Sequence, residues 1–552
     1  MERIFENHAI RKSRELGGTW KLTTLPEGNI FTVIVPSCWE QEGELYSYEG
    51  QASYKKSFFL TKDTAVNLIF KGVGHWAEVL VDGVSLATHY DAHTPFSVSL
   101  PRLSQGEHVL EVIADNRISE ESALHISNDY YHYGGLVRPV FLEEISDVFL
   151  SSLHVTPSYQ GQWSGLVQVT VKNLSSQEKT VCVQGTLHHT DFSFEPITVT
   201  GQSETLLTKE VMFEDVLPWN CETPNLYEMK LTLWEENTPV DDLIERIGFR
   251  QIEWKDSSLY LNGEKIFIKG FNRHEDFGVV GCAIPLSLMQ KDLSLMRQMG
   301  ANAVRTSHYP NDERFLDLCD EMGFLVWEEG HARGLSEAQM RLPNFLTQSK
   351  ENVREMIEYH YNHPSIVIWG ILNECASDTE WGKTVYQALF EEIKRLDQSR
   401  PMTFASCKFF KDICLGLPDV VSYNIYPEWY VKQPAGEYFE QLYDWVQTTE
   451  GKGKPFLLSE FGAGGIYGFR EPGKPKWSED RQAEILDHML GAFMSRPQVS
   501  GVFIWQFSDC RVSEENWWYG RPRTFNNKGV VDEYRRPKLA FEVVKKWFTK
   551  KE

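Results

Sequence analysis

The sequence has no long uninterrupted apolar run and no excess of basic residues. One of its longest apolar stretches, VSGVFIWQF at 499–507, is about half of the ~20 residues that a membrane-spanning helix needs. The start, MERIFENHAIRKSREL, mixes both charge signs and has no apolar segment, so we expect no signal peptide. With 55 Lys and Arg against 78 Asp and Glu, the net charge is −23. We therefore expect no membrane partner and no nucleic-acid partner, because phosphate contacts need a basic surface.

The cysteines also show no recognisable spacing pattern. Nine cysteines lie scattered along the chain, an odd number, and no CxxC pair occurs. A disulfide framework and a structural zinc site are therefore not expected, and the composition favours the reducing cytoplasm.

The length of 552 residues predicts about three domains. Up to about residue 248 the chain is punctuated like an all-β protein, with short alternating runs such as AEVLVDGVSLATH (77–89) and LVQVTVKNLSS (166–176). Near 146 one strand pattern ends and another opens. The sequence thus predicts a β-sandwich over 1–147 and a smaller sandwich of immunoglobulin size over 148–248.

After residue 250 short apolar runs alternate with amphipathic stretches such as 287–300 and 351–362, which is typical of β-α units. The runs that we expect to be strands are 266–271, 303–308, 324–329, 366–374, 402–406, 420–426, 455–462 and 502–509. Eight such units predict a (β/α)8 TIM barrel over 249–552, with its chemistry at the C-terminal ends of the strands.

Polar residues gather at these strand ends, and two glutamates stand out among them. Glu374 ends the run IVIWGIL, and Glu460 follows PFLLS. Strands 4 and 7 of a regular barrel lie across its mouth from each other, so the two carboxylates could flank a bond held between them. Such a pair is what glycoside hydrolysis uses, although a glutamate at a strand end is as often a member of an ion pair.

Four segments of the chain resemble the signatures of glycoside hydrolase family 2. They are GFNRHED (270–276), RTSHYPN (305–311), NHPSIVIWGILNE (362–374) and LLSEFG (457–462). The resemblance implies a jelly-roll sandwich, an immunoglobulin-like sandwich and a TIM barrel, in the order predicted above. It also implies a retaining mechanism in which Glu374 is the acid/base and Glu460 the nucleophile, with Asn373 on the sugar 2-hydroxyl.

The sugar is indicated by the segment RTFNNKGVVDEY, which resembles the Asn-x-Lys motif by which β-glucuronidases hold a substrate carboxylate. Here the motif is formed by Asn526 and Lys528, a directed amide donor and a point positive charge. Residues 521–552 carry ten basic and four acidic side chains, a net +6, which leaves −29 for residues 1–520 of the total −23. The overall charge therefore does not exclude an anionic sugar.

Other positions match the same group of enzymes. YNIYPEWY (423–430) resembles a segment whose tyrosines approach the uronate, and NDYYHYGGLVRP (128–139) a loop that brings an aspartate to the sugar. The further sugar-binding residues that we expect are Asp129, His274, His308, Arg333, Asn424, Tyr426, Tyr430 and Trp505. Arg333 could contact the carboxylate, recognise an axial 4-hydroxyl or pair at the rim. The short segment 331–345 lacks the long loop of some gut bacterial glucuronidases, which predicts a more open site.

We therefore expect an exo-β-glucuronidase that acts on small-molecule or oligosaccharide β-uronides. A β-galacturonidase or dual β-hexuronidase is the alternative, and a β-galactosidase or a non-catalytic carbohydrate-binding protein stands further behind. No metal site is expected, because His274, His308 and His331 lie on three strands without ligand spacing, and no cofactor fingerprint occurs. The resemblance implies a homo-oligomer, a dimer or tetramer.

Overall fold

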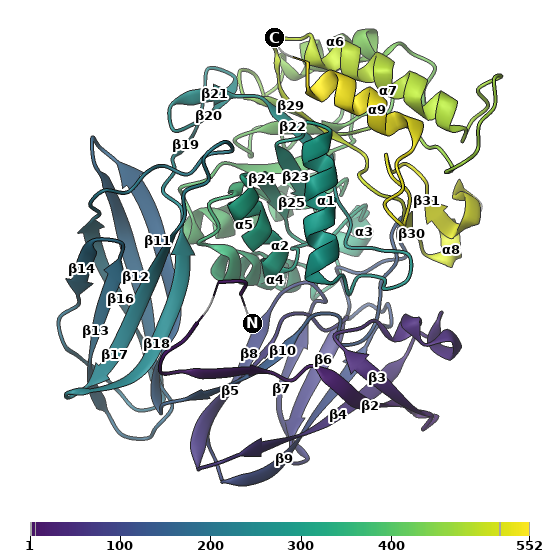
Figure 1. Ribbon diagram of the computed structural model, residues 1–552. Helices are drawn as coiled ribbons and strands as arrows, with labels where there is room; N and C mark the ends of the chain where they lie inside the picture. The colour runs from purple at the N-terminus through teal and green to yellow at the C-terminus, as the bar shows by residue number, and fades with distance from the viewer. Residues whose placement is uncertain (1–2, 6, 518–519, 551–552) are drawn as a thin grey trace.

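The computed structural model describes residues 3–5, 7–517 and 520–550. The outermost residues of the first and last expected domains, 1–2 and 551–552, lie outside the described part. Within it the chain forms two β-sandwiches followed by a closed eight-stranded barrel, which confirms the predicted fold class (Figure 1).

The first sandwich consists of two antiparallel sheets. The four-stranded sheet has the order β1 (Lys12–Glu15), β10 (Val140–Ile145), β5 (Thr64–Phe70), β8 (Phe96–Leu103). The six-stranded sheet has the order β3 (Ile30–Val35), β2 (Gly18–Leu25), β4 (Gln51–Leu60), β9 (Gly106–Asp115), β6 (Trp76–Val81), β7 (Val84–Tyr90). Trp20, Tyr54, Phe70 and Leu142 are completely or almost completely buried between the sheets.

Two residues separate β10 from the first strand of the second sandwich. One sheet has the order β11 (Val148–Tyr159), β12 (Trp163–Asn173), β16 (Ser203–Met212). The other has β14 (Thr190–Ser193), β13 (Lys179–Leu187), β17 (Tyr227–Glu235), β18 (Thr238–Ile247), with β15 (Ile197–Val199) paired to β13. In β12 buried and half-exposed residues alternate, as a strand with one face toward a core requires.

The barrel is closed by eight parallel strands in chain order. They are β22 (Ile268–Asn272), β23 (Ala303–Thr306), β24 (Leu325–Glu329), β25 (Ile366–Asn373), β26 (Met402–Ser406), β27 (Val421–Asn424), β28 (Phe456–Phe461) and β29 (Val499–Ile504). All eight residues of β25 are buried and all but the last, Asn373, are nonpolar, because a parallel strand of a barrel is covered on both faces. A small hairpin sheet, β19 (Ile252–Lys255), β20 (Ser258–Leu261) and β21 (Glu264–Ile266), precedes β22.

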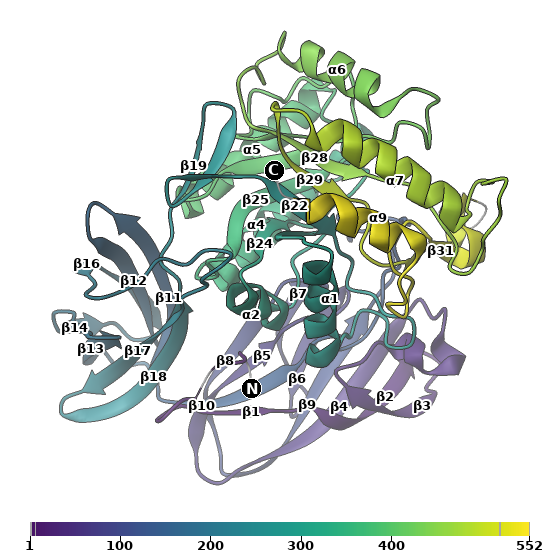
Figure 2. The ribbon, with the colours of Figure 1, turned by 45° about the horizontal axis from the view of Figure 1, so that its top comes forward.

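Helices surround the barrel and lie farthest from the sandwiches where α6, α7 and α9 pack together (Figure 2). Their bounds are α1 (Leu286–Gln298), α2 (Glu313–Met322), α3 (Glu337–Met340), α4 (Phe345–His360), α5 (Glu380–Leu396), α6 (Ala435–Val446), α7 (Glu479–Met494), α8 (Glu514–Trp517) and α9 (Leu539–Phe548). Residues 407–420 join β26 to β27 as a loop, so one of the expected β-α units has no helix.

The last strand differs from its predicted bounds of 502–509. β29 begins at Val499 and ends at Ile504. After it the chain bonds on both sides: the Phe507 amide donates to the Asn272 carbonyl of β22 (2.9 Å), and the Gln506 amide donates to the Lys528 carbonyl outside the barrel strands (3.1 Å). The short pair β30 (Cys510–Arg511) and β31 (Phe525–Asn526) continues this contact. This places the segment 526–528 at the barrel mouth.

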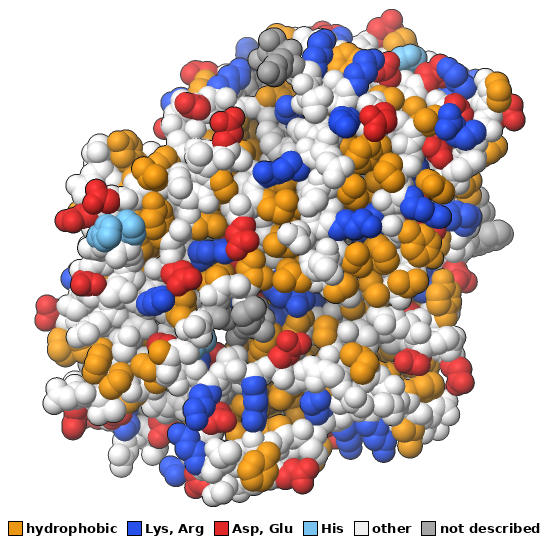
Figure 3. Space-filling view, in the orientation of Figure 1, with side chains coloured by type: hydrophobic (Ala, Val, Ile, Leu, Met, Phe, Trp, Pro, Cys, Tyr) orange, Lys and Arg blue, Asp and Glu red, His pale blue; other side chains and the backbone are white. Residues whose placement is uncertain are grey.

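Two buried arginines near the N-terminus hold the three parts of the chain together. Arg11 donates to Glu143 of the first sandwich (3.1 Å) and to Asp241 of the second (2.7 Å). Arg3 donates to Asp317 of α2 in the barrel (2.8 Å). On the face seen in Figure 3, acidic and basic side chains are interspersed rather than gathered into one basic stripe.

Candidate active site

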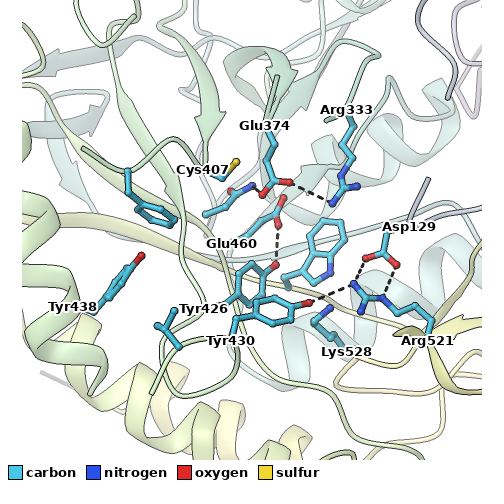
Figure 4. A pocket seen from close by; sticks show the side chains of 14 residues that line it. Asp129, Arg333, Glu374, Cys407, Tyr426, Tyr430, Tyr438, Glu460, Arg521 and Lys528 are labelled. Carbon is cyan, nitrogen blue, oxygen red and sulfur yellow. Dashed lines mark hydrogen bonds and ion pairs between the residues drawn. The ribbon is translucent and has the colours of Figure 1, made fainter. Parts of the chain in front are cut away.

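A pocket of about 270 Å³ lies at the C-terminal ends of the barrel strands, where a TIM barrel carries its chemistry (Figure 4). Its walls are formed by the ends of barrel strands, by barrel loops and by one loop of the first sandwich. The lining residues are Asp129, Arg333, Glu374, Cys407, Phe409, Asn424, Tyr426, Tyr430, Val431, Tyr438, Glu460, Trp505, Arg521 and Lys528.

Two carboxylates, Glu374 and Glu460, share this pocket. Glu460 lies in β28 and accepts hydrogen bonds from Arg305 (3.0 Å) and from the Tyr426 hydroxyl (2.8 Å). Glu374 directly follows β25 and accepts from Asn424 Nδ2 (2.9 Å). Its φ of 55° is left-handed, a conformation that costs an ordinary residue about 1–2 kcal/mol and that is found at functional turns. Both side chains are thus fixed by neighbours rather than left to rotate.

The two carboxylates are close enough to influence each other's protonation. Burial, and next to it the charge of Glu374, raise the pKa of Glu460 to about 7, against the lowering effect of Arg305 and Arg333. Glu460 therefore exchanges its proton readily near neutral pH, and its ionised form is stabilised by the hydrogen bonds from Arg305 and Tyr426.

Arg305, which is completely buried, connects the pair to the layer below the pocket. Its guanidinium donates to both oxygens of Glu329 (2.8 and 2.9 Å), to Asn373 Oδ1 (2.8 Å) and to Glu460. His308 Nδ1 lies 2.9 Å from Glu329 Oε1. Burial, and next to it Arg305, hold the pKa of His308 well below its usual range, so this imidazole is neutral.

The wall opposite the glutamates is cationic (Figure 4). Arg521 makes a bidentate ion pair with Asp129, with Nε–Oδ1 2.7 Å and Nη2–Oδ2 2.6 Å. Lys528, only 2% exposed, lies 5.8 and 5.5 Å from the ring centres of Tyr426 and Tyr430. Burial alone would raise the pKa of the Tyr430 hydroxyl, but Lys528 and Arg521 lower it. One positive charge more than Asp129 can neutralise therefore faces the pocket.

Arg333 lies between the glutamates and this cationic wall. Its Nη1 donates to Asn128 Oδ1 (2.9 Å) and its Nη2 to Glu374 Oε2 (3.3 Å). The side chain follows β24 and connects the barrel to the loop of the first sandwich that carries Asp129.

Of the sequence-predicted residues, most line the pocket. These are Asp129, Arg333, Glu374, Asn424, Tyr426, Tyr430, Glu460, Trp505 and Lys528. Four others lie behind this lining: His274, His308, Asn373 and Asn526, each at most 1% exposed. The ring of His308 stacks on Trp505 with centres 5.0 Å apart, and Asn526 Nδ2 donates to Asp129 Oδ2 (3.0 Å). In this arrangement they orient lining residues.

The lining also contains residues that the sequence did not single out. Arg521 belongs to the basic C-terminal segment, but no motif marks it, because its partner Asp129 is almost 400 residues away in the chain. Cys407 and Phe409 come from the loop that replaces a helix after β26, and Val431 and Tyr438 follow β27. These give the pocket an apolar side next to the glutamates.

Possible metal ligands gather elsewhere among the described residues. The groups whose ligand atoms approach one another are His75, His125 and His132; Asp91, His125 and His331; and Asp317, Asp320 and His363. None of these residues lines the pocket. Within the described part of the chain, no helix combines the length and the apolar character that a bilayer crossing requires.

Comparisons with known proteins agree with this geometry. Residues 252–551 match the family model "Glycosyl hydrolases family 2, TIM barrel domain", and residues 148–250 match "Glycosyl hydrolases family 2". A β-glucuronidase of Paenibacillus borealis is 26% identical, with 97% of this chain and 96% of that protein covered. A β-galacturonidase of Eisenbergiella tayi, solved bound to galacturonate, is 50% identical with a TM-score of 0.97, covering 99% of both chains. A β-D-glucuronidase of Dictyoglomus thermophilum is 26% identical, with a TM-score of 0.85 and 99% and 98% covered.

Proposed function

Because the chain belongs to glycosyl hydrolases family 2 and is of the β-glucuronidase type, we propose that it is a retaining exo-β-hexuronidase that prefers β-D-galacturonides. One observation carries the proposal: a pair of glutamates and a buried lysine face each other across one small pocket. The pair supplies the hydrolytic chemistry, and the lysine selects an anionic sugar.

The proposed chemistry gives each glutamate a different role. The ionised Glu460 attacks the anomeric carbon while Glu374 gives its proton to the departing glycosidic oxygen, which leaves a glycosyl ester on Glu460. Glu374, now ionised, takes a proton from water, and the resulting hydroxide cleaves the ester and releases the uronic acid. Arg305 and Tyr426 hold the attacking oxygens of Glu460 in place, so little reorganisation accompanies the reaction.

The carboxylate of the sugar would lie against Lys528, with Arg521 and the Tyr430 hydroxyl beside it. Asp129 already balances Arg521, so Lys528 provides the net charge that a carboxylate can neutralise. Asp129 Oδ1 can accept a further hydrogen bond beside that from Arg521, which suits a sugar hydroxyl, and the indole face of Trp505 suits a sugar ring face.

The preference for galacturonides over glucuronides depends on carbon 4, where the two sugars differ. The solved relative with 50% identity is a β-galacturonidase, whereas the named β-glucuronidases given above are 26% identical. Arg333 lies between the wall that would hold the carboxylate and the glutamates, and its guanidinium supplies donors for a hydroxyl oxygen. We assign to Arg333 the hydrogen bond that recognises the axial 4-hydroxyl.

The decisive experiment compares nitrophenyl β-galacturonide, β-glucuronide and β-galactoside under the same conditions. We expect kcat/KM to be highest for the galacturonide and lowest for the neutral galactoside. A higher value for the glucuronide would make that sugar, the second candidate that the more distant relatives support, the substrate. Faster hydrolysis of the galactoside would overturn the uronate proposal. Proton NMR of the first-formed product must show the β-anomer, since an α-anomer would exclude retention.

Two accompanying proposals concern assembly and compartment. We propose a dimer or tetramer, to be measured by light scattering coupled to size exclusion, where a single chain mass would contradict it. We also propose a reducing compartment, because Cys38 and Cys282 lie 3.4 Å apart as free thiols. Thiol titration of the unfolded protein should then give all nine cysteines of the sequence.

A further inference from the structure

A cluster of buried histidines lies between the first sandwich and the barrel, outside the pocket described above. His75 precedes β6, His125 and His132 belong to the loop between β9 and β10, and His331 follows β24. Together with Asp91 after β7, these residues form what we term the histidine cluster. They are between 0% and 9% exposed. The rings of His75 and His125 are 3.7 Å apart, and those of His125 and His331 4.4 Å.

His75 is the most unusual member, because it is fully buried and neither ring nitrogen has a hydrogen-bond partner among the described residues. Its backbone is tied down, with the amide donating to the Asp115 carbonyl (2.7 Å). An unpaired buried polar atom costs about 1–3 kcal/mol, and buried polar groups in native proteins nearly always have a partner. A partner from outside the protein chain would remove this cost.

The two histidines of the loop are prepared to act as ligands. His132 Nε2 lies 2.7 Å from the Ile126 carbonyl, which can only accept, so the neutral ring carries its proton there and has a lone pair at Nδ1. His125 Nδ1 lies 2.7 Å from the Tyr90 hydroxyl, while its Nε2 has no partner among the described residues. A hydrogen bond from the far ring nitrogen is how proteins orient histidines that bind metals.

A buried carboxylate also favours a cation here. Asp91, completely buried beside His331 (3.2 Å), supplies a negative charge at the edge of the cluster.

We propose that His75, His125 and His132 bind one divalent transition-metal ion of the zinc class. Their ligand atoms lie within 4.8 Å of one another, and Asp91, His125 and His331 form a second such group that shares His125. Zinc–nitrogen bonds of about 2.1 Å in a tetrahedron bring ligand atoms to about 3.4 Å from one another. The ring of His75 must turn out of its stack to reach this distance, and it loses no hydrogen bond in doing so. Imidazoles select zinc-like ions over Ca²⁺ and Mg²⁺, which take oxygen ligands.

The third group of possible ligands differs in its neighbours. Asp317, Asp320 and His363 lie beside Arg3 and Arg246, whose guanidinium groups approach Asp317 to 2.8 and 3.7 Å. The acidic charge there is already balanced by the protein. In the histidine cluster, by contrast, both ring nitrogens of His75 and one of His125 have no hydrogen-bond partner among the described residues, and this distinguishes it as the metal site.

The ion would position the sugar-binding wall. Between His125 and His132 the loop carries Asp129, which holds Arg521 and Asn526 at the pocket. An ion bound to both histidines and to His75 of the sandwich would fix this short segment at both ends. The proposal does not depend on which sugar the enzyme hydrolyses, since metal content and stability report on it without any substrate.

The test uses the full-length protein without an affinity tag. After incubation with excess Zn²⁺ and exhaustive buffer exchange, elemental analysis should find about one zinc per chain, and a chelator should lower the melting temperature. His75→Gln and His132→Gln should each lose most of the zinc and the response to chelator. His108→Gln is the matched control, because His108 is a buried histidine of the same sandwich with partners on both nitrogens. It should retain the wild-type zinc content.

A measurement on the wild-type protein keeps the proposal testable even if the variants fold poorly. Co²⁺ in a tetrahedral nitrogen site gives visible absorption bands, which should appear on titration and disappear when Zn²⁺ is added. The proposal would be overturned if the wild-type protein retained less than about a tenth of an equivalent of zinc and if neither Zn²⁺ nor chelator changed its melting temperature. Equal zinc loss in the His108→Gln control would overturn the assignment to this cluster.

Discussion

Replacing Lys528 by methionine tests the link between pocket charge and substrate choice. Methionine keeps the length of the apolar stem and removes only the ammonium group. Arg521 remains, but its charge is balanced by the two contacts to Asp129 at 2.7 and 2.6 Å. A sugar carboxylate would then face no net positive charge. Breaking a buried charge pair costs about 2–5 kcal/mol, and at about 3 kcal/mol kcat/KM falls by roughly two orders of magnitude.

The assay measures kcat/KM for nitrophenyl β-galacturonide and nitrophenyl β-galactoside with wild type and Lys528→Met. The neutral galactoside lacks the carboxylate, so its value should change by no more than about threefold. Lys476→Met is the control variant: its ammonium lies over the rings of Trp429 (4.5 Å) and Tyr430 (5.8 Å), but Lys476 does not line the pocket. It should leave both substrates nearly unaffected. Equal losses on both substrates in Lys528→Met would refute the reasoning, since Lys528 would then only support the fold.

Further predictions concern protonation and stability. Arg333→Met removes a cation that lowers the pKa of Glu460, which must be ionised to attack, so the acidic limb of the kcat/KM profile should move to higher pH; an unmoved limb would contradict the coupling. Burial lowers the pKa of His132 to about 3, so the unfolded chain binds protons that the folded chain does not. The free energy of unfolding should be constant above about pH 6.5 and fall at lower pH by about 1.4 kcal/mol per pH unit for each such histidine, measured by denaturant titration; no acid loss would show that the histidines are charged when folded. Arg11→Met leaves two buried carboxylates unpaired and should cost about 3–5 kcal/mol, whereas the exposed Arg14→Met should cost little in the same titration.

The barrel could be predicted from the sequence because its strands are covered on both faces. A run such as IVIWGIL has to be apolar throughout, and this distinguishes it from the amphipathic helices around it. The strand ends were harder to place: the apolar pattern of the last strand continues through Trp505 and Phe507, although β29 ends at Ile504. There the backbone bonds alternately to the ends of barrel strands β28 and β22 and to the 526–531 segment, and hydrophobicity does not show where the regular strand pairing stops.

The sequence points to site residues where one residue lies at a strand end, and it gives no such signal where two distant segments meet. Glu374 and Glu460 follow directly from the barrel rule. Arg521 does not, because its function at the pocket arises from Asp129, which a different domain supplies. His331 likewise gives no hint in the sequence of its neighbours His75 and His125, which come from turns far away in the chain. Such groups are brought together by the tertiary fold, and their spacing in the sequence does not reveal it.

The loop of residues 116–139 runs from β9 to the barrel mouth and back to β10, and this has a consequence for recombination. A barrel expressed alone would keep both glutamates, yet Arg521 would lose its carboxylate partner and add a second unbalanced cation to the pocket. Chimaeras that exchange the first sandwich between relatives would exchange a wall of the binding site at the same time. Engineering a new sugar specificity therefore requires that the barrel and this loop be exchanged together. A chimaera joined at the domain boundary would separate them.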